Sequence, residues 1–328
     1  MKKITVIGGG TGTTVILSGL KKYDYDLSVI VTMMDSGGST GRLRSQLEIL
    51  PPGDLRQCLV ALSSADETLK HLFLYRFETG DLKGHNFGNI FIAALEKIKG
   101  DYPTTLAYLH TFLKVKGTVI PVTYSQTDMC VTYEKGNTVR TEGEIDDNHT
   151  EKTKVKSAFL DPEVAANADA LKRIEESNFI ILGPGDIYTS IVPVLLVGGI
   201  KDAIKNSKAK LVYIPNLMTK SGQTPGYSVA DHVKDITTYT GRTPDAVIVN
   251  DAPVPSDIMN WYESYGEEVV KDDLGSIEHD MLVIRTDILN TQKVEKKDSD
   301  NVSPLVRSVL RHDSHKLAKI VDSLCTTL

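Results

Sequence analysis

The chain opens with an apolar run at residues 4–7, then glycines, then apolar residues spaced by three and four from 13 to 23. The short run is typical of a buried strand, and the longer spacing is typical of a helix. A second short apolar run covers residues 27–34. This order of strand, loop, helix and strand predicts a βαβ unit, which builds a parallel sheet with a right-handed crossover.

The period of the pattern changes twice further along the chain. From about 53 to 114 the apolar residues recur with the period of a helix, and from about 116 to 160 they recur at about every second position, as in strands. Strands and helices then alternate again. We therefore predict one α/β domain over 1–328, with a Rossmann-like, doubly wound, mainly parallel sheet, helices on both faces and a small antiparallel β insertion. The polar stretch 290–306 is predicted to be a loop before a last helix.

Composition and charge exclude several kinds of partner. Charged residues make up 24% of the 328 and hydrophobic ones 41%, as in ordinary soluble domains. The formal charge of -6 opposes attraction to nucleic acid or to an anionic membrane, so we expect neither. Three distant cysteines form no CxxC pair, which argues against a disulfide framework or a zinc cage. Because no apolar run suits a signal peptide or a membrane span, we expect a cytoplasmic protein.

The sequence VIGGGTGTT (6–14) places glycines directly between the first strand and the first helix. Glycines let the backbone approach a ligand, and a helix N-terminus offers free amides and a favourable dipole to an anion. The loop fails the dinucleotide pattern GxGxxG because Thr13 replaces the third glycine, and no lysine follows as in a P-loop. A tight turn without a ligand is the alternative interpretation. Asp35, which ends the second strand, keeps a nicotinamide-dependent dehydrogenase as a third hypothesis.

Two further loops of this kind follow predicted strands. MDSGGSTGRLR (34–44) and ILGPGDIYTS (181–190) combine glycines with hydroxyls, and the first adds an acid and two arginines. The carboxyl ends of parallel strands meet at one edge of a sheet, where open α/β folds bind ligands. We therefore predict a ligand with several anionic or polar parts, such as a nucleotide diphosphate derivative. The predicted ligand-binding residues are Gly9, Gly10, Thr11, Gly12, Asp35, Ser36, Gly37, Gly38, Ser39, Thr40, Arg42, Arg44, Asn86, Asn89, Gly183, Pro184, Gly185, Tyr188, Thr189, Ser190, Asn216 and Thr219.

The turn GHNFGN (84–89) precedes an apolar helix and carries several polar groups. His85 is a candidate general acid or base, or a hydrogen-bond donor to the ligand. Asn86 as a helix cap explains much of the turn without any ligand. Arg42, Arg44 and Arg56 could neutralise a diphosphate, and a solvated helix charge is the alternative for at least one of them.

Metal binding has the weakest signal in the sequence. Asp35 and Asp54 are candidate magnesium ligands, but no dense cluster of carboxylates or histidines is spaced for a protein-only cage. We therefore expect no required cofactor, and magnesium only together with a bound nucleotide diphosphate. Asp35 is also the candidate catalytic residue if the protein is a transferase.

Seven segments, taken together, resemble one known family. They are VIGGGTG, DSGGSTGRLR, LPPGDLRQCLVAL, YRF, GHNFGN, LGPGDIYTS and NLMTKSGQTPGYSVADH, and they resemble the YvcK-like gluconeogenesis factors, a bacterial branch of the CofD (2-phospho-L-lactate transferase) superfamily. The resemblance runs to about residue 255 and resumes at RHDSHKLAKIV. It implies a Rossmann-like fold, a cytoplasmic location, UDP-N-acetylglucosamine as ligand, and a role in gluconeogenic growth and cell shape. Ser36 and Gln223 stand where this family commonly has acids.

Two hypotheses follow for the function. The first is a nucleotide-sugar-binding regulatory protein, with a homo-oligomer and regulatory protein partners as further expectations. The alternative is a CofD-like, magnesium-dependent transferase in which Asp35 positions a hydroxyl for attack on a nucleotide diphosphate adduct. The missing acid at Ser36 favours the first hypothesis over the second.

Overall fold

The computed structural model describes residues 1–275, 277–278, 281–290 and 309–328. Its main sheet has the strand order β10-β11-β9-β8-β7-β1-β2-β3. All neighbours from β11 to β3 are parallel, and β10 is an antiparallel edge strand. The strands are β1 (Lys3–Gly8), β2 (Asp26–Val31), β3 (Thr118–Pro121), β7 (Phe179–Leu182), β8 (Lys210–Tyr213), β9 (Ala246–Asn250), β10 (Ile277–Glu278) and β11 (Met281–Thr286).

The order of the strands creates a switch point beside β1. The chain leaves β1 towards β2 and β3, then returns to the other side of β1 as β7 and continues outward through β8, β9 and β11. In such doubly wound sheets the crevice at the carboxyl ends of the two strands flanking the reversal is the usual ligand site. The expected Rossmann-like α/β fold is confirmed, and its switch point lies between β1 and β7.

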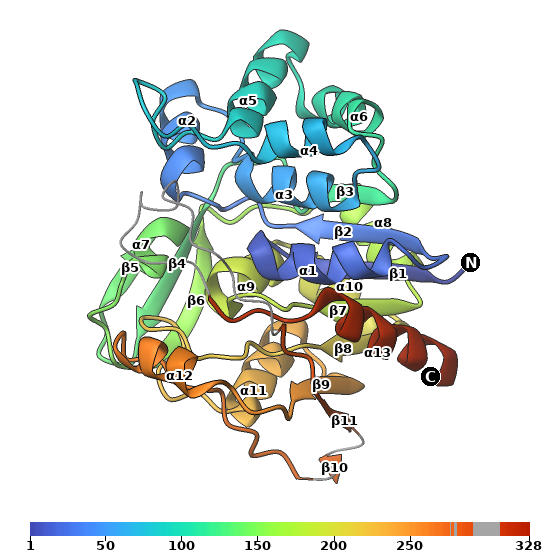
Figure 1. Cartoon of the computed structure of the whole chain (residues 1–328), viewed down its shortest axis with the longest axis vertical. Coiled ribbons are helices and arrows are strands. Elements are labelled where there is room, and N and C mark those ends of the chain that lie inside the picture. Colours follow the sequence, from blue (N-terminus) through green and yellow to red (C-terminus); the bar gives the residue numbers. More distant parts are fainter. Residues whose placement is uncertain (276, 279–280, 291–308) are drawn as a thin grey trace.

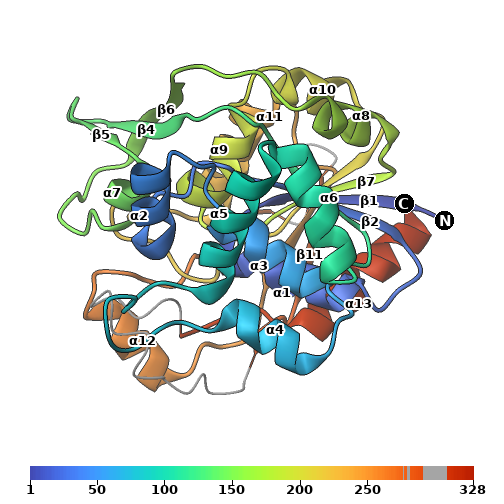
Figure 2. The same ribbon diagram turned by 90° about the horizontal axis from the view of Figure 1, so that it is seen from above.

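Helices cover both faces of the sheet, as predicted (Figures 1 and 2). The helices α1, α3 and α13 pack together on one face, and α8, α10 and α11 pack on the other. The helices α4, α5 and α6 extend the first layer, and the N- and C-terminal ends lie close together. Their bounds are α1 (Gly10–Leu20), α3 (Gly53–Leu62), α4 (Glu67–Leu74), α5 (Phe87–Lys99), α6 (Tyr102–Phe112), α8 (Ala168–Glu176), α10 (Ile200–Asn206), α11 (Val229–Thr240) and α13 (Ser314–Thr327).

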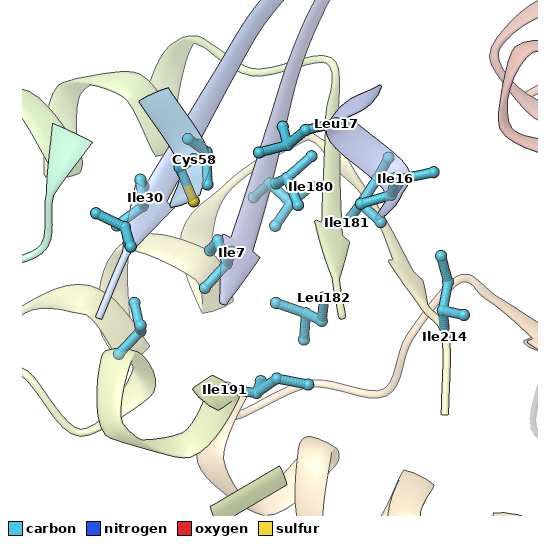
Figure 3. Close-up of a cluster of buried hydrophobic side chains, with 14 of the residues drawn as sticks. Ile7, Ile16, Leu17, Ile30, Cys58, Ile180, Ile181, Leu182, Ile191 and Ile214 are labelled. Carbon is cyan, nitrogen blue, oxygen red and sulfur yellow. The ribbon is translucent and has the colours of Figure 1, made fainter. Parts of the chain in front are cut away.

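The core forms because the central strands are apolar on both faces. All four residues of β7 are buried, and so are the last five of β1. Figure 3 shows Ile7 and Leu182 of these strands among side chains from other elements, including Leu17 of α1 and Cys58 of α3. Continuous apolar runs of this kind are expected of parallel strands covered by helices on both sides. The core therefore fixes the strand ends from which the polar loops emerge.

The β-rich segment divides between two sheets. The strands β4 (Asp128–Tyr133), β5 (Thr138–Arg140) and β6 (Val155–Asp161) form a small antiparallel sheet in the order β5-β4-β6. The expectation placed the whole stretch 116–160 in the insertion, but β3 pairs with β2 in the main sheet. A four-residue strand buried at three positions has the same apolar pattern in either sheet, so the pattern could not separate the two. The short helix α7 (Glu142–Asp146) follows β5.

Three further α-helices and one π-helix complete the described chain: α2 (Gly38–Leu47), η1 (Ile187–Ile191), α9 (Val192–Leu195) and α12 (Ser256–Glu263). The predicted loop at 290–306 falls outside the described residues apart from residue 290. No helix in the described part of the chain is long and apolar enough to cross a membrane.

Candidate functional site at the carboxyl edge of the sheet

The glycine loop after β1 forms the first part of the site. Gly9 precedes helix α1, and Gly10 has a φ of +64°, a left-handed conformation that only glycine adopts readily. Thr13 Oγ1 donates to the Gly9 carbonyl at 2.9 Å, which closes the first turn of α1. The helix begins without a side-chain cap. Its first amides therefore lie at the sheet edge without a capping side chain, as an anion site requires.

The loop after β7 lies directly against the loop after β1. A Cβ atom on Gly12 would overlap the carbonyl oxygen of Pro184, so only glycine permits this approach. A Cβ atom on Gly10 would lie 3.7 Å from Ser190 Oγ, and one on Gly185 would lie 3.7 Å from the Gly9 carbonyl oxygen. The two loops that flank the switch point thus form one continuous surface of backbone and hydroxyl groups.

The loop after β2 brings a carboxylate to the same edge. Asp35 Oδ1 accepts a hydrogen bond from the Gly37 amide at 3.0 Å. Asp35 Oδ2 lies against Gly53, the first residue of α3, where a Cβ atom would overlap it. In the same way Asp54 lies against Gly9. The starts of α1 and α3 and the carboxylates of Asp35 and Asp54 therefore lie close together beside the glycine loops.

The turn before α5 contacts the start of α2. Ser39 Oγ lies 3.3 Å from His85 Nδ1 and accepts from the Asn86 amide at 3.1 Å. Asn89 Nδ2 donates to Ser39 Oγ at 3.4 Å and to Thr40 Oγ1 at 3.3 Å. Burial, followed by repulsion from two arginines, lowers the pKa of His85. The structure brings these five predicted residues together.

Asn86 has a structural role in this turn. Its side-chain oxygen accepts from the Asn89 amide at 3.2 Å and caps α5, as the sequence suggested. Arg56 Nε donates to Asn89 Oδ1 at 2.7 Å, and Arg56 is itself almost fully buried. Thus Arg56 holds the α5 start in place rather than lying on a solvated face.

Four predicted ligand residues have other contacts in the structure. Arg42 donates to the Lys83 carbonyl at 3.2 Å, and Arg44 pairs with Asp128 at 2.8 Å. The Tyr188 hydroxyl donates to Asp235 at 2.6 Å. Thr219 Oγ1 accepts from the Glu268 amide at 2.9 Å. Contact of these four with a ligand stays a prediction, and the protein contacts explain each side chain without one.

Among the remaining predicted residues, Asn216 and Thr189 contact the loop after β7 or belong to it. Asn216 Nδ2 donates to Asp186 Oδ1 at 2.8 Å, and Asp186 precedes η1. Thr189 is buried within η1, and its Oγ1 accepts from Gln223 Nε2 at 3.4 Å. The segment after β8 is therefore bonded to the loop after β7.

Helix α7 brings two acids that the sequence did not indicate. Glu142 Oε2 accepts from the Ser36 amide at 3.2 Å, although the two residues are 106 positions apart. Asp146 Oδ1 pairs with Lys220 Nζ at 3.3 Å. Thr141 followed by Glu144 is a capping-box pattern, and Thr141 does cap the helix. That pattern predicts a short helix but not its position against the glycine loops.

The acids at this edge perturb one another. Burial, followed by repulsion from Asp35, Asp146 and Asp54, raises the pKa of Glu142 well above its ordinary value. Burial alone would lower the pKa of Lys220, but nearby carboxylates, Asp146 first, raise it above its ordinary value. Within the described residues no group of three or more His, Cys, Asp or Glu side chains is arranged to hold a metal ion. A metal ion at this edge would need oxygens from a ligand.

The fold and these loops define a class: a Rossmann-like α/β protein with glycine-rich loops and uncapped helix starts at the carboxyl edge of its sheet. The family model described as "2-phospho-L-lactate transferase CofD" matches residues 4–289, and the chain belongs to this family. The chain is 37% identical over 325 residues to the "Gluconeogenesis factor" of Bacillus subtilis, covering 98% of each chain. It is 36% identical over 324 residues to the "Gluconeogenesis factor" of Halalkalibacterium halodurans, covering 98% of this chain and 95% of the relative.

A solved structure has the same fold. It is a crystal structure of a UPF0052 family protein from Bacillus halodurans, with a TM-score of 0.87 and 36% identity. The similarity covers 98% of this chain and 99% of that one. The expected resemblance to the gluconeogenesis factors and to CofD is therefore confirmed over nearly the whole chain.

Proposed function

We propose that this chain is a regulatory protein that binds a nucleotide sugar, UDP-N-acetylglucosamine, at the carboxyl edge of β1, β2 and β7. The observation that carries the proposal is the contact between the loops after β1 and β7 at the switch point, where Gly12 meets Pro184. The names of the relatives support a role in growth on gluconeogenic carbon sources. We further propose a cytoplasmic location and an influence on cell shape.

The helix starts supply the physical basis for holding a diphosphate. Among the described helices, α1, α2 and α3 begin at this edge without a side-chain cap. The helices α4 to α8, α11 and α13 are capped by a side chain, whereas α9, α10 and α12 are not. Free amides at a helix N-terminus bind phosphate oxygens, and the helix dipole adds attraction. Three such starts at one edge suit two phosphates and a sugar.

Regulation requires that binding favours one conformation over another. A ligand shifts an equilibrium only by the difference of its affinities for the two states. The loops after β1, β2 and β7 come from distant parts of the chain, so a ligand that touches all three would favour the state in which they are together. A partner protein that recognises this state would then respond to the supply of the nucleotide sugar.

The direct test is calorimetry of the whole chain with UDP-N-acetylglucosamine and with GDP, each with and without magnesium. We expect binding of the uridine sugar that does not depend on magnesium. A preference for GDP with magnesium would contradict the proposal and support the transferase described below.

The variant Gly10→Leu tests the site itself. Its backbone must keep a φ near +64°, which costs a non-glycine residue about 1–2 kcal/mol, and its side chain would project towards the phosphate position. We expect loss of UDP-N-acetylglucosamine binding with the fold retained by circular dichroism. Gly136→Leu, in the turn between β4 and β5, is the control because Gly136 also has a positive φ, and a Cβ atom there would meet only open space. Equal affinity of both variants would remove Gly10 from the site.

A transferase is the second candidate, because Asp35 and Asp54 lie against the glycines of the site. The CofD family match supports it as well. Asp35 would orient a substrate hydroxyl towards a phosphorus of a nucleotide diphosphate adduct, whose nucleoside monophosphate leaves when the new P–O bond forms. Magnesium bridging the diphosphate would neutralise charge on the phosphates.

The variant Asp35→Asn separates the two candidates. A transferase predicts magnesium-dependent release of a nucleoside monophosphate by the wild type, lost in Asp35→Asn while nucleotide binding remains. Asp24→Asn, at an exposed position, is the control. No release by the wild type with either nucleotide supports the regulatory function.

A further inference from the structure

Helix α7 contacts the segments that follow β2, β7 and β8, and the first two of these carry loops of the proposed site. It is part of the insertion, between β5 and β6, yet it lies against η1, which follows β7. Its first residue bonds to the loop after β2, and its last residue bonds to the segment after β8. A five-residue helix that touches the ends of β2, β7 and β8 can fix their relative positions.

The contact with the loop after β2 is reciprocal. Glu142 Oε2 accepts from the Ser36 amide at 3.2 Å, and the Gly143 amide donates to Ser36 Oγ at 2.8 Å. A Cβ atom on Gly37 would lie 3.7 Å from Glu142 Oε2. Two hydrogen bonds in opposite directions hold the backbone at the residue that precedes the paired glycines.

The contact with the segment after β8 involves Asp146. Its Oδ1 pairs with Lys220 Nζ at 3.3 Å and accepts from Gln223 Nε2 at 3.3 Å. Gln223 is fully buried, and its Nε2 also lies 3.4 Å from Thr189 Oγ1 of η1. One carboxylate therefore connects α7 to the segment after β8 directly and to the loop after β7 through one amide.

We infer that α7 positions the loops of the nucleotide-sugar site, with Glu142 and Asp146 as positioning residues that act through Ser36, Lys220 and Gln223. The inference rests on the proposed function. It assigns the antiparallel insertion a role in that function: the insertion holds the ligand loops in place, and ligand binding in turn stabilises the docked insertion.

The test compares Glu142→Ala, Glu142→Gln and the control Glu144→Ala in the full chain. Glu144 is exposed on the same helix. Glutamine keeps an oxygen that accepts from Ser36, so it should behave as the wild type does, whereas alanine loses this acceptor. We expect hydrogen exchange of the backbone over 35–41 to be about fivefold faster in Glu142→Ala, the factor that one typical hydrogen bond controls. Affinity for UDP-N-acetylglucosamine should fall by a similar factor.

Asp146→Asn, with Asp147→Asn as its exposed control, is a second variant in case Glu142→Ala does not fold. It leaves Lys220 without its closest carboxylate and should weaken ligand binding, while the control does not. Exchange over 35–41 in Glu142→Ala equal to that in Glu144→Ala, or Asp146→Asn binding as tightly as its control, would overturn the inference. A wild type that does not bind the nucleotide sugar overturns the proposed function, and hydrogen exchange still decides whether α7 positions the loop.

Discussion

At the scale of single residues, burial in the protein interior changes the pKa of His232. It is 1% exposed, and its Nδ1 lies 3.1 Å from the Tyr213 hydroxyl. Burial lowers its pKa from 6.5 to about 4, with a small opposing effect of Asp231. The neutral ring is therefore the stable form in the folded protein, because a buried charge without a counter-ion is costly.

This burial predicts a pH dependence of stability. Below pH 6.5 the unfolded chain binds a proton at His232 and the folded chain does not, so the free energy of unfolding falls as the pH drops from 6.5 to about 4. A shift of this size corresponds to about 3 kcal/mol, at about 1.4 kcal/mol per pKa unit. In urea titrations at several pH values, His232→Phe should show a shallower fall than the wild type. His71→Phe, at an exposed position, is the control, and identical slopes in all three proteins would contradict the prediction.

At the scale of the elements, the helices α1 to α6 differ in whether a side chain caps their N-terminus. The residues Asp66, Asn86 and Asp101 directly precede α4, α5 and α6, and the side chain of each accepts a hydrogen bond from a backbone amide of the first helical turn. Each of these caps satisfies a backbone amide of the first turn with a side chain near it in the sequence. The helices α1, α2 and α3 leave that position to glycine or proline, which accept nothing through a side chain. Their first turns therefore lack the side-chain caps that complete the first turns of α4, α5 and α6.

Asn86 tests whether a cap explains a predicted ligand residue. Asn86→Ala should lower the free energy of unfolding by about 1 kcal/mol, the usual cost of losing an N-cap. Asn86→Asp should restore most of it, because a carboxylate oxygen can accept from the Asn89 amide. Chemical denaturation of both variants measures this. If the residue only caps α5, both variants bind UDP-N-acetylglucosamine as the wild type does, and weaker binding by the well-folded Asn86→Asp would show contact with the ligand.

At the scale of the whole molecule, the proposed site joins segments that begin near residues 8, 35, 142 and 183. None of them is near another in the sequence, and the sheet order places three of them at one edge. A ligand that bridges them binds the folded chain alone, since the unfolded chain keeps no such arrangement. Binding therefore adds to the stability of the whole protein.

This linkage predicts a thermal shift. At a concentration of UDP-N-acetylglucosamine about 100 times its Kd, the folded state should gain about 2.7 kcal/mol, which raises Tm by a few degrees. Differential scanning calorimetry of the wild type and of Gly10→Leu, with and without the ligand, measures the effect. The variant should show no rise, and a rise of equal size in both proteins would place the ligand elsewhere.

Much of the fold was accessible from local patterns. Apolar runs followed by glycines marked β1, β2 and β7 and the loops after them, because a strand covered on both faces must be apolar along its length. Asn86 was correctly predicted as a cap, since capping depends on residues three positions apart. The assignment of 116–160 to one insertion was wrong at β3, since a short apolar strand does not reveal its partner.

The sequence by itself determined the α/β class, the glycine loops and the edge of the sheet where they meet, because strand direction and turn chemistry depend on neighbouring residues. Only the tertiary structure decided that α7 lies on these loops, that Glu142 bonds to Ser36, and that Arg44 pairs with Asp128. The last two of these contacts join residues that are 106 and 84 positions apart. Their formation depends on how the insertion folds back over the sheet, which no local period records.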